Sequence, residues 1–272
     1  MTLFQSVALG VTQGLTEFLP VSSSGHLALG ERLLKTQMEQ PLAFEVLLHA
    51  ATLLATVMVF WRELLDLIRY VVQQAPRAIA RQGWSAGVWR NPRGRMVCAV
   101  VVITLVTAPF GVLFEEQIEQ MAGSMTGLGL GWLLTAAWLI AAHWARERYP
   151  DAGAIPLWVM VVLGLAQASA LIPSVSRSGM TIATALLCGV DRRTSGELSF
   201  IASIPAIAGA SILMIPKINM AEVSAATASA GFVASLIAGW VALVVLLRFV
   251  RQGRLWIFAP YCIILGLYAL LQ

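Results

Sequence analysis

The chain has 272 residues, of which 58% are hydrophobic and 12% charged, and its mean hydropathy is +0.80. So apolar a composition excludes a soluble domain with a charged surface and indicates a protein that folds in a lipid bilayer. The net charge of +4 does not indicate a nucleic-acid partner, because the basic residues lie between apolar runs rather than along one face.

Six apolar runs approach the length of about 20 residues that a helix needs to cross a membrane. They cover residues 42–60, 96–113, 127–145, 200–215, 225–247 and 255–271. Two further apolar stretches, 3–34 and 155–190, are interrupted by Pro, Gly and Ser clusters at 20–25 and 173–179. Backbone that leaves a helix at membrane depth is tolerated only where protein or water meets it. We therefore expect two re-entrant hairpins whose tips face an internal cavity, with a proline-kinked spanning helix as the alternative.

The charges of the connecting segments predict an orientation. Segment 61–95 carries seven arginines, whereas segment 114–122 carries three glutamates and no basic residue. Basic loops stay in the cytoplasm, so the first segment is predicted to be cytoplasmic and the second external. Both termini are then external, and the two hairpins enter the membrane from opposite sides.

The two hairpins also resemble each other in sequence. Leu-Pro-Val-Ser-Ser-Ser-Gly at 19–25 is similar to Ile-Pro-Ser-Val-Ser-Arg-Ser-Gly at 172–179, and three apolar runs follow each of them. Opposite entry together with a repeat predicts inverted topology. The expected fold is an all-α integral membrane protein with six transmembrane helices plus two re-entrant helical hairpins. We expect a single membrane domain, residues 1–272, with approximate inverted repeats at 1–145 and 150–272.

Polar residues on both sides of the first break are candidates for chemistry. Glu17 lies one helical turn after Gln13, on the same face. A carboxylate in an apolar segment is costly and indicates a function, although an ion pair that anchors the hairpin is the alternative. The residues that follow begin a new helix, whose N–H groups and positive dipole end suit an anion. They are Ser22, Ser23, Ser24, Gly25 and His26.

The second break carries Arg177, the only arginine far from a predicted membrane face. A buried guanidinium needs an acidic partner, and its planar fork suits phosphate oxygens; pairing with Glu17 alone is the alternative. The polar neighbours in this cluster are Ser174, Ser176, Ser178 and Thr181. His49 and His143 are interpreted as local hydrogen-bonding residues.

Three motifs in this order carry a family resemblance. They are Gln-x-x-x-Glu at 13–17, Pro-Val-Ser-Ser-Ser-Gly-His at 20–26 and Pro-Ser-Val-Ser-Arg-Ser-Gly-Met-Thr at 173–181. Over essentially its whole length, the chain resembles the bacitracin-resistance type of undecaprenyl-diphosphate phosphatase. The resemblance implies hydrolysis of undecaprenyl diphosphate to undecaprenyl phosphate and phosphate, which recycles the carrier lipid for bacterial cell-wall synthesis. It also implies the bacterial cytoplasmic (inner) membrane, an active site open to the external side, and a divalent cation, Mg²⁺ or Ca²⁺.

The resemblance assigns roles by position. Gln13 and Glu17 stand at the paired acidic sites expected to hold the metal, Ser23 and His26 at the first catalytic motif, and Arg177 with Ser176 and Thr181 at the phosphate-binding motif. Two residues depart from the family pattern. Gln13 stands where Glu is frequent, which weakens a site built from two carboxylates, and Ser174 stands where Gly is usual.

We expect Arg177 and the helix N-terminal amides to hold the diphosphate while Ser23 attacks the terminal phosphorus, with His26 or Glu17 moving the proton. Attack by water or by His26 itself stays open. The alternative from another class is a lipid transporter or flippase with a midplane phosphate site, because transporters share inverted repeats and broken helices. The acid-phosphatase-like lipid phosphatases fit poorly, since Ala183 stands where they need a histidine. The expected partners are a polyprenyl diphosphate and the membrane, with no nucleic acid, and a homodimer is left open.

Overall fold

The computed structural model describes residues 1–34, 36, 41–114, 124–217 and 224–272. In these residues the regular structure is helical and no strand is formed, which confirms the all-α class. Five apolar helices are long enough to cross a membrane, so the chain is a multi-pass membrane protein. Within the described residues they are α3 (Pro41–Val59), α6 (Pro92–Leu113), α8 (Met125–Ala141) together with the turn that follows it, α11 (Arg192–Met214) and α12 (Ala225–Arg251).

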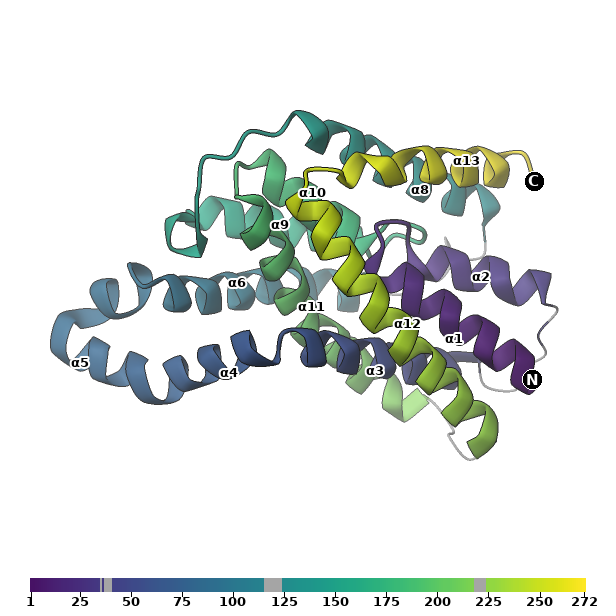
Figure 1. Cartoon of the computed structure of the whole chain (residues 1–272), viewed down its shortest axis with the longest axis horizontal. Coiled ribbons are helices and arrows are strands. Elements are labelled where there is room, and N and C mark those ends of the chain that lie inside the picture. The colour runs from purple at the N-terminus through teal and green to yellow at the C-terminus, as the bar shows by residue number, and fades with distance from the viewer. Residues whose placement is uncertain (35, 37–40, 115–123, 218–223) are drawn as a thin grey trace.

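The sixth apolar run forms shorter helices than the other five. It divides into a 3-10 turn, η7 (Leu255–Phe258), and α13 (Ala259–Leu270). The 12 residues of α13 rise about 18 Å at 1.5 Å per residue, less than a hydrocarbon core of about 30 Å. Figure 1 shows α13 running beside α8, and the two helices pack together.

Each interrupted stretch is a pair of short helices joined by a tight tip. The first pair is α1 (Leu3–Phe18) and α2 (Ser23–Leu33), and the second is α9 (Leu157–Ser169) and α10 (Arg177–Leu187). The second helix of each pair, α2 or α10, begins within the Pro-, Gly- and Ser-containing cluster that interrupts the apolar stretch. In the second pair Ser176 sets this start, because its hydroxyl oxygen accepts a hydrogen bond from the Gly179 N–H at 3.1 Å.

The two tips share an unusual backbone conformation and touch each other. Ser22 and Ser174 have φ angles of 71° and 62°, in the left-handed region that stops a helix. The Ser174 N–H donates a hydrogen bond to the Ser24 hydroxyl at 3.4 Å. The approach of the two breaks that the repeat predicts is therefore present.

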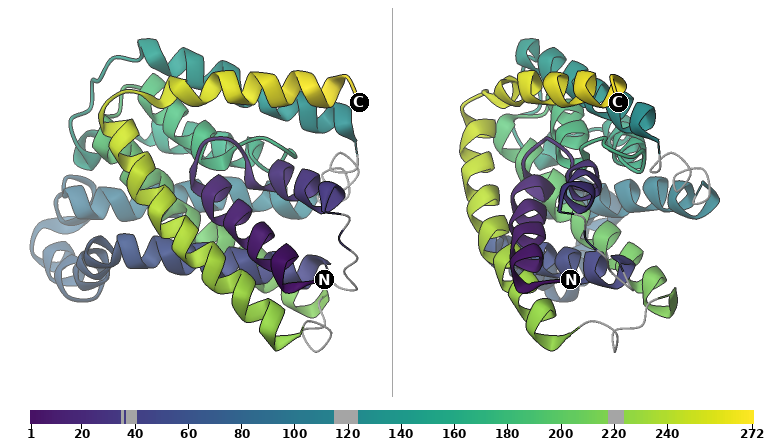
Figure 2. Two further views of the ribbon diagram at one scale, coloured as in Figure 1. Left: turned by 45° about the vertical axis from the view of Figure 1, so that its right-hand side comes forward. Right: turned by 90° about the vertical axis from the view of Figure 1, so that its right-hand side faces the viewer.

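The helices of the two halves interlock. The first hairpin packs through α1 along α12 of the second half, and the second hairpin packs through α9 along α6 of the first (Figure 2). Small residues allow the α1–α12 contact: a Cβ added at Gly14 would lie 2.5 Å from the Ser235 carbonyl oxygen. Close approach through small residues is a usual way for membrane helices to associate.

The segment after α3 is helical over more of its length than the surface helix and loop that the sequence predicts at 73–91. It consists of α4 (Trp61–Arg69), η1 (Tyr70–Gln74), α5 (Ala75–Trp84) and η2 (Ser85–Trp89). In Figure 1 α4, α5 and the turns beside α5 project to the left of the other helices, and α6 leads back to pack along α9 and α11. The acidic segment at 115–119 and residues 218–222, on which part of the predicted orientation rests, lie outside the described residues. Further 3-10 turns are η3 (Ala142–Trp144), η4 (Ala152–Ala154) and η5 (Ile215–Lys217).

The main hydrophobic core lies against the first tip. Trp132 of α8 is fully buried among Phe18, Val21 and other apolar side chains. Its indole N–H donates a hydrogen bond to the Val21 carbonyl at 2.8 Å. This bond satisfies a backbone group that the break has released from the helix, and so fixes the tip in place.

Candidate active site

A cavity of about 350 Å³ lies where the two tips meet. The ends of α1, α2, α9 and α10 form it together with the sides of α3, α6 and α11. Six of the residues singled out from the sequence line it: Glu17, Ser22, Ser23, Ser24, Ser176 and Arg177. The cavity size is typical of a small-molecule site, and its polar groups are few and convergent.

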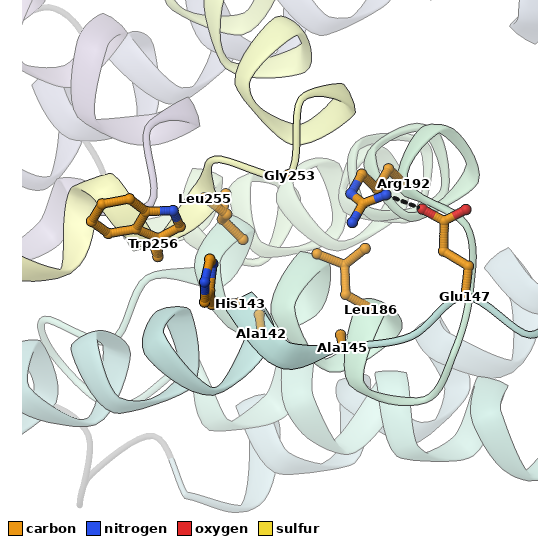
Figure 3. A pocket seen from close by; sticks show the side chains of 9 residues that line it. All are labelled: Ala142, His143, Ala145, Glu147, Leu186, Arg192, Gly253, Leu255 and Trp256. Atoms are coloured by element: carbon orange, nitrogen blue, oxygen red, sulfur yellow. Dashed lines mark hydrogen bonds and ion pairs between the residues drawn. The ribbon is translucent and has the colours of Figure 1, made fainter.

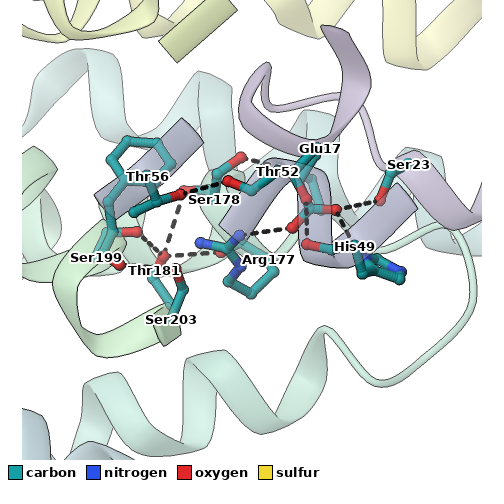
Figure 4. Close-up of polar contacts among 12 residues, drawn as sticks. Glu17, Ser23, His49, Thr52, Thr56, Arg177, Ser178, Thr181, Ser199 and Ser203 are labelled. Atoms are coloured by element: carbon teal, nitrogen blue, oxygen red, sulfur yellow. Dashed lines mark hydrogen bonds and ion pairs between the residues drawn. The ribbon is translucent and has the colours of Figure 1, made fainter. Parts of the chain in front are cut away.

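Glu17 is the centre of the polar contacts (Figure 4). One carboxylate oxygen, Oε1, accepts a hydrogen bond from Arg177 Nη2 at 2.7 Å. The other, Oε2, accepts from the Ser23 hydroxyl at 2.8 Å and from Gln13 Nε2 at 3.2 Å. Glu17 is 8% exposed, so its charge is compensated by these partners rather than by bulk water. The carboxylate thus joins a cation to a hydroxyl across the two hairpins.

Arg177 is the first residue of α10, and the Ser176 cap aims its side chain at the first hairpin. Its second terminal nitrogen, Nη1, is buried and has no hydrogen-bond partner among the described residues. The guanidinium carbon lies 5.8 Å from the centre of the Phe200 ring. A guanidinium has five N–H donors, so one hydrogen bond to Glu17 leaves further donors for an anion.

His49 of α3 is a member of the site that sequence reasoning missed. It lines the cavity, its Nδ1 lies 3.0 Å from Gln13 Nε2, and the same atom lies 3.7 Å from Glu17 Oε2. The available signal was a polar side chain inside an apolar span, which is costly unless it has a partner. The sequence alone did not indicate that α3 passes beside Glu17.

Gln13 lies behind Glu17 rather than on the cavity lining. It is fully buried between Glu17 and His49, and its Oε1 oxygen has no hydrogen-bond partner among the described residues. Its amide nitrogen therefore orients two cavity residues, and a bare amide oxygen is left beside the Glu17 carboxylate.

His26 does not join the Glu17 cluster. Its Nδ1 lies 2.6 Å from the Ser22 carbonyl oxygen, and its Nε2 lies 2.7 Å from the Tyr261 hydroxyl. The His26 ring stacks on Tyr261 of α13, and His26 is not among the cavity-lining residues. Both ring nitrogens are engaged, so in this conformation His26 fixes the start of α2 against α13.

The other predicted site residues support the tips from behind. A Cβ added at Gly25 would lie 2.6 Å from the Trp132 ring, so only glycine allows this contact. The Ser174 hydroxyl oxygen is buried without a hydrogen-bond partner in the described residues. Thr181 Oγ1 donates to the Arg177 carbonyl at 2.8 Å and lies 2.5 Å from the Ser199 hydroxyl oxygen. Ser178 is fully buried, and neither Ser178 nor Thr181 lines the cavity.

The start of α2 adds backbone donors to the site. Ser22 makes no side-chain hydrogen bond to the amides of α2, unlike Ser176 at α10. Uncapped amides at a helix start carry partial positive charge and bind phosphate well. The site can therefore hold an anion from two sides while a hydroxyl and a carboxylate lie beside it.

A second, far smaller pocket lies at the start of α11 (Figure 3). Its volume is about 10 Å³, and the Arg192–Glu147 ion pair closes one side at 2.5 Å. A volume of that size holds about one water molecule, so it is not a substrate site.

Known proteins resemble this chain over nearly all of its length. Residues 6–268 match the family model described as bacitracin resistance protein BacA. An undecaprenyl-diphosphatase of Parabacteroides distasonis is 35% identical, with 98% of this chain and 97% of the relative covered. One from Korarchaeum cryptofilum is 35% identical, with 98% of each covered, and one from Treponema denticola is 36% identical, with 98% and 96% covered.

Proposed function

The chain belongs to the bacitracin resistance protein BacA family, and on that premise we propose that it hydrolyses undecaprenyl diphosphate to undecaprenyl phosphate and phosphate at the cavity between its two tips. Relatives that match over nearly their whole length are named for this substrate. The product is the carrier lipid that cell-wall synthesis uses again. The transporter alternative is not favoured, because no relative cited above is named for transport.

The observation that carries the proposal is that the two carboxylate oxygens of Glu17 bind different partners. Its Oε2 accepts the Ser23 hydroxyl proton in a 2.8 Å hydrogen bond, while Arg177 neutralises its Oε1 at 2.7 Å. A nucleophile needs a base within hydrogen-bond reach, and here that base is a carboxylate rather than an imidazole. Of the two proton acceptors that the sequence left open, His26 and Glu17, we therefore assign the role of base to Glu17.

Arg177 and the start of α2 bind the diphosphate. Arg177 and the first residues of α2 line the cavity that contains Ser23, and the amides at the start of α2 have no side-chain cap. Donors in fixed positions stabilise the charge that develops on the phosphate oxygens as the bond breaks. Ser22, Ser24 and Ser176 add hydroxyl groups to the same lining.

The reaction proceeds in two displacements. Ser23 Oγ forms a bond to the terminal phosphorus while the bond from that phosphorus to the bridging oxygen breaks, and undecaprenyl phosphate leaves. The Ser23 proton passes to Glu17 and then to the departing phosphate. Water next attacks the phosphoserine, and Glu17 takes a proton from this water and returns it to Ser23 Oγ as phosphate departs.

The donor atoms beside Glu17 suit a divalent cation. Mg²⁺ and Ca²⁺ prefer oxygen ligands, and Mg²⁺ often uses one or two protein carboxylates together with substrate phosphates. Glu17 would supply one carboxylate, whereas Gln13 lies behind it, off the cavity lining, with an Oε1 that has no hydrogen-bond partner in the described residues. The described residues contain no group of three or more His, Cys, Asp or Glu side chains, so phosphate oxygens complete the ligand set. Such a cation, when bound, neutralises charge on the diphosphate.

The finer membrane arrangement is also part of this proposal. Six transmembrane helices, with η7 and α13 as the sixth, and two re-entrant hairpins form an inverted repeat in the bacterial inner membrane, and the cavity opens to the external side. The short helices of each hairpin and the interlocked packing support this arrangement. The arginines of segment 61–95 support the orientation.

Phosphate release from undecaprenyl diphosphate by the purified protein tests the proposal. Wild type should release phosphate, and Glu17→Gln and Arg177→Ala should lower turnover by about 100-fold or more, as loss of a catalytic base or an anion-binding group does. Arg193→Ala is the matched control, because this arginine pairs with Glu197 on the surface. Wild type that moves the lipid between leaflets without releasing phosphate would contradict the proposal.

A further inference from the structure

The cavity between the tips has an apolar end that the chemistry at Glu17 does not use. Five of its lining residues there are Ala170 and Leu171 at the end of α9, and Ala206, Ile207 and Ala210 on α11. A charged diphosphate does not bind favourably to an apolar surface. An apolar wall that continues from a polar pocket is suited to a ligand with a charged head and a hydrocarbon tail.

The apolar wall continues out of the cavity along α11. Ala206, Ala210 and Leu213 are spaced i, i+4 and i+7, so they share one face of the helix. Ala210 is exposed, and Leu213 is 60% exposed. The face therefore leads from the cavity to the outer surface of the helices, and alanine at its first two positions leaves room beside the helix.

Helix α6 supplies the opposite side of this path. Thr107 lines the cavity, and Phe110, one turn later, is 36% exposed. A Cβ added at Gly111 would lie 3.9 Å from Leu171, so the end of the second hairpin reaches α6 at this level. The path is thus bounded by α6, by α11 and by the tip residue Leu171.

Resting on the proposed function, we infer that the Ala206–Ala210 face of α11 binds the first isoprene units of the polyprenyl tail and guides the rest of the chain into the membrane. The cavity of about 350 Å³ lies at the low end of ligand-pocket volumes, so most of a 55-carbon chain lies outside it. Each buried carbon of the tail adds to affinity through the hydrophobic effect. The face therefore makes the enzyme prefer long prenyl diphosphates over short ones.

A chain-length series tests the inference with the purified protein. In wild type, KM should fall from dimethylallyl to geranyl to farnesyl diphosphate. Ala210→Phe and Ala206→Phe fill the path and should raise KM for farnesyl diphosphate by about tenfold or more, roughly 1.4 kcal/mol. The same variants should raise KM for dimethylallyl diphosphate by a smaller factor than KM for farnesyl diphosphate, because dimethylallyl places one isoprene unit against the path and farnesyl places three.

Gly209→Phe is the matched control. It adds the same bulk to the same turn of α11, where an added Cβ meets nothing within 4 Å. Ala206→Val, a smaller change, is used if a phenylalanine variant unfolds, as judged by its thermal midpoint. An unchanged chain-length series in the alanine variants, or an equal loss in Gly209→Phe, would overturn the inference and leave the proposed function standing. Wild type that hydrolyses none of these diphosphates, nor undecaprenyl diphosphate, would instead remove the proposed function.

Discussion

At the scale of single residues, the site depends on how the partners of Glu17 are divided. The sequence indicated Glu17, Ser23 and Arg177, because each is a polar group at a break in an apolar stretch. It named Glu17 as a partner for Arg177 but did not indicate that Ser23 would contact Glu17. The 2.8 Å bond from Ser23 to Glu17 and the engagement of His26 by Tyr261 depend on side-chain directions and on the packing of α13. Neither follows from spacing along the chain.

His49 provides a prediction about positioning. Its contact with Gln13 Nε2 at 3.0 Å fixes the amide that donates to Glu17. His49→Ala should lower kcat by about tenfold, because one hydrogen bond contributes about 0.5–1.5 kcal/mol, and should leave KM nearly unchanged. His49→Gln, which keeps a side-chain acceptor, should restore much of the rate. His143→Ala is the control, since that histidine lies in the small pocket away from the tips. Equal losses in both alanine variants would argue against the positioning role.

Ser174, which stands where the family usually has glycine, provides a prediction about stability. It has a φ of 62° and a buried hydroxyl without a partner in the described residues. Glycine adopts this conformation without strain, so Ser174→Gly should stabilise the protein by about 1 kcal/mol. The thermal midpoint in detergent measures this, and phosphate release measures whether the hydroxyl binds substrate. A lower midpoint would contradict the strain argument, and a large loss of activity would show that Ser174 contacts substrate.

At the scale of helices, the sequence predicts where the two apolar stretches are interrupted, but it does not predict how many residues each interruption contains. Proline, glycine and serine clusters located both breaks, but the helices restart at Ser23 and Arg177, inside the motifs. The capping bond from Gly179 to Ser176 determines one restart, and such local bonds are not fixed by composition. The sequence predicts a surface helix and loop at 73–91, whereas the helical structure already begins at residue 61, because many arginines in a segment indicate a cytoplasmic location without indicating where its helices begin.

The α1–α12 contact provides a prediction at this scale. A Cβ at Gly14 would lie 2.5 Å from the Ser235 carbonyl oxygen and 2.7 Å from Gly239 N, both backbone atoms that yield little. Gly14→Ala should therefore force the helices apart and destabilise the protein by about 1–3 kcal/mol. The thermal midpoint checks this against Gly209→Ala, whose added Cβ meets nothing within 4 Å. Equal midpoints for the two variants would mean that the close contact does not contribute to stability.

At the scale of the whole molecule, the repeat in the sequence indicated two similar halves but not how they interlock. The first hairpin packs on α12 and the second on α6, so each half completes the other. This exchange brings Glu17 and Arg177, 160 residues apart in sequence, to 2.7 Å. A weak repeat predicts that the two halves are similar. It does not predict that each hairpin packs on the other half, because that packing depends on small residues such as Gly10 and Gly14 that contact α12.

The central claim is that Ser23, activated by Glu17, attacks the terminal phosphorus. A single turnover with undecaprenyl diphosphate labelled in its terminal phosphate, quenched in acid, tests this most directly. The account predicts label on Ser23 in wild type, and in Ser23→Ala no labelled protein and turnover lower by about 1000-fold or more. Phosphate release at a near-normal rate by Ser23→Ala, with no label on the wild-type protein, would contradict it and assign the attack to water.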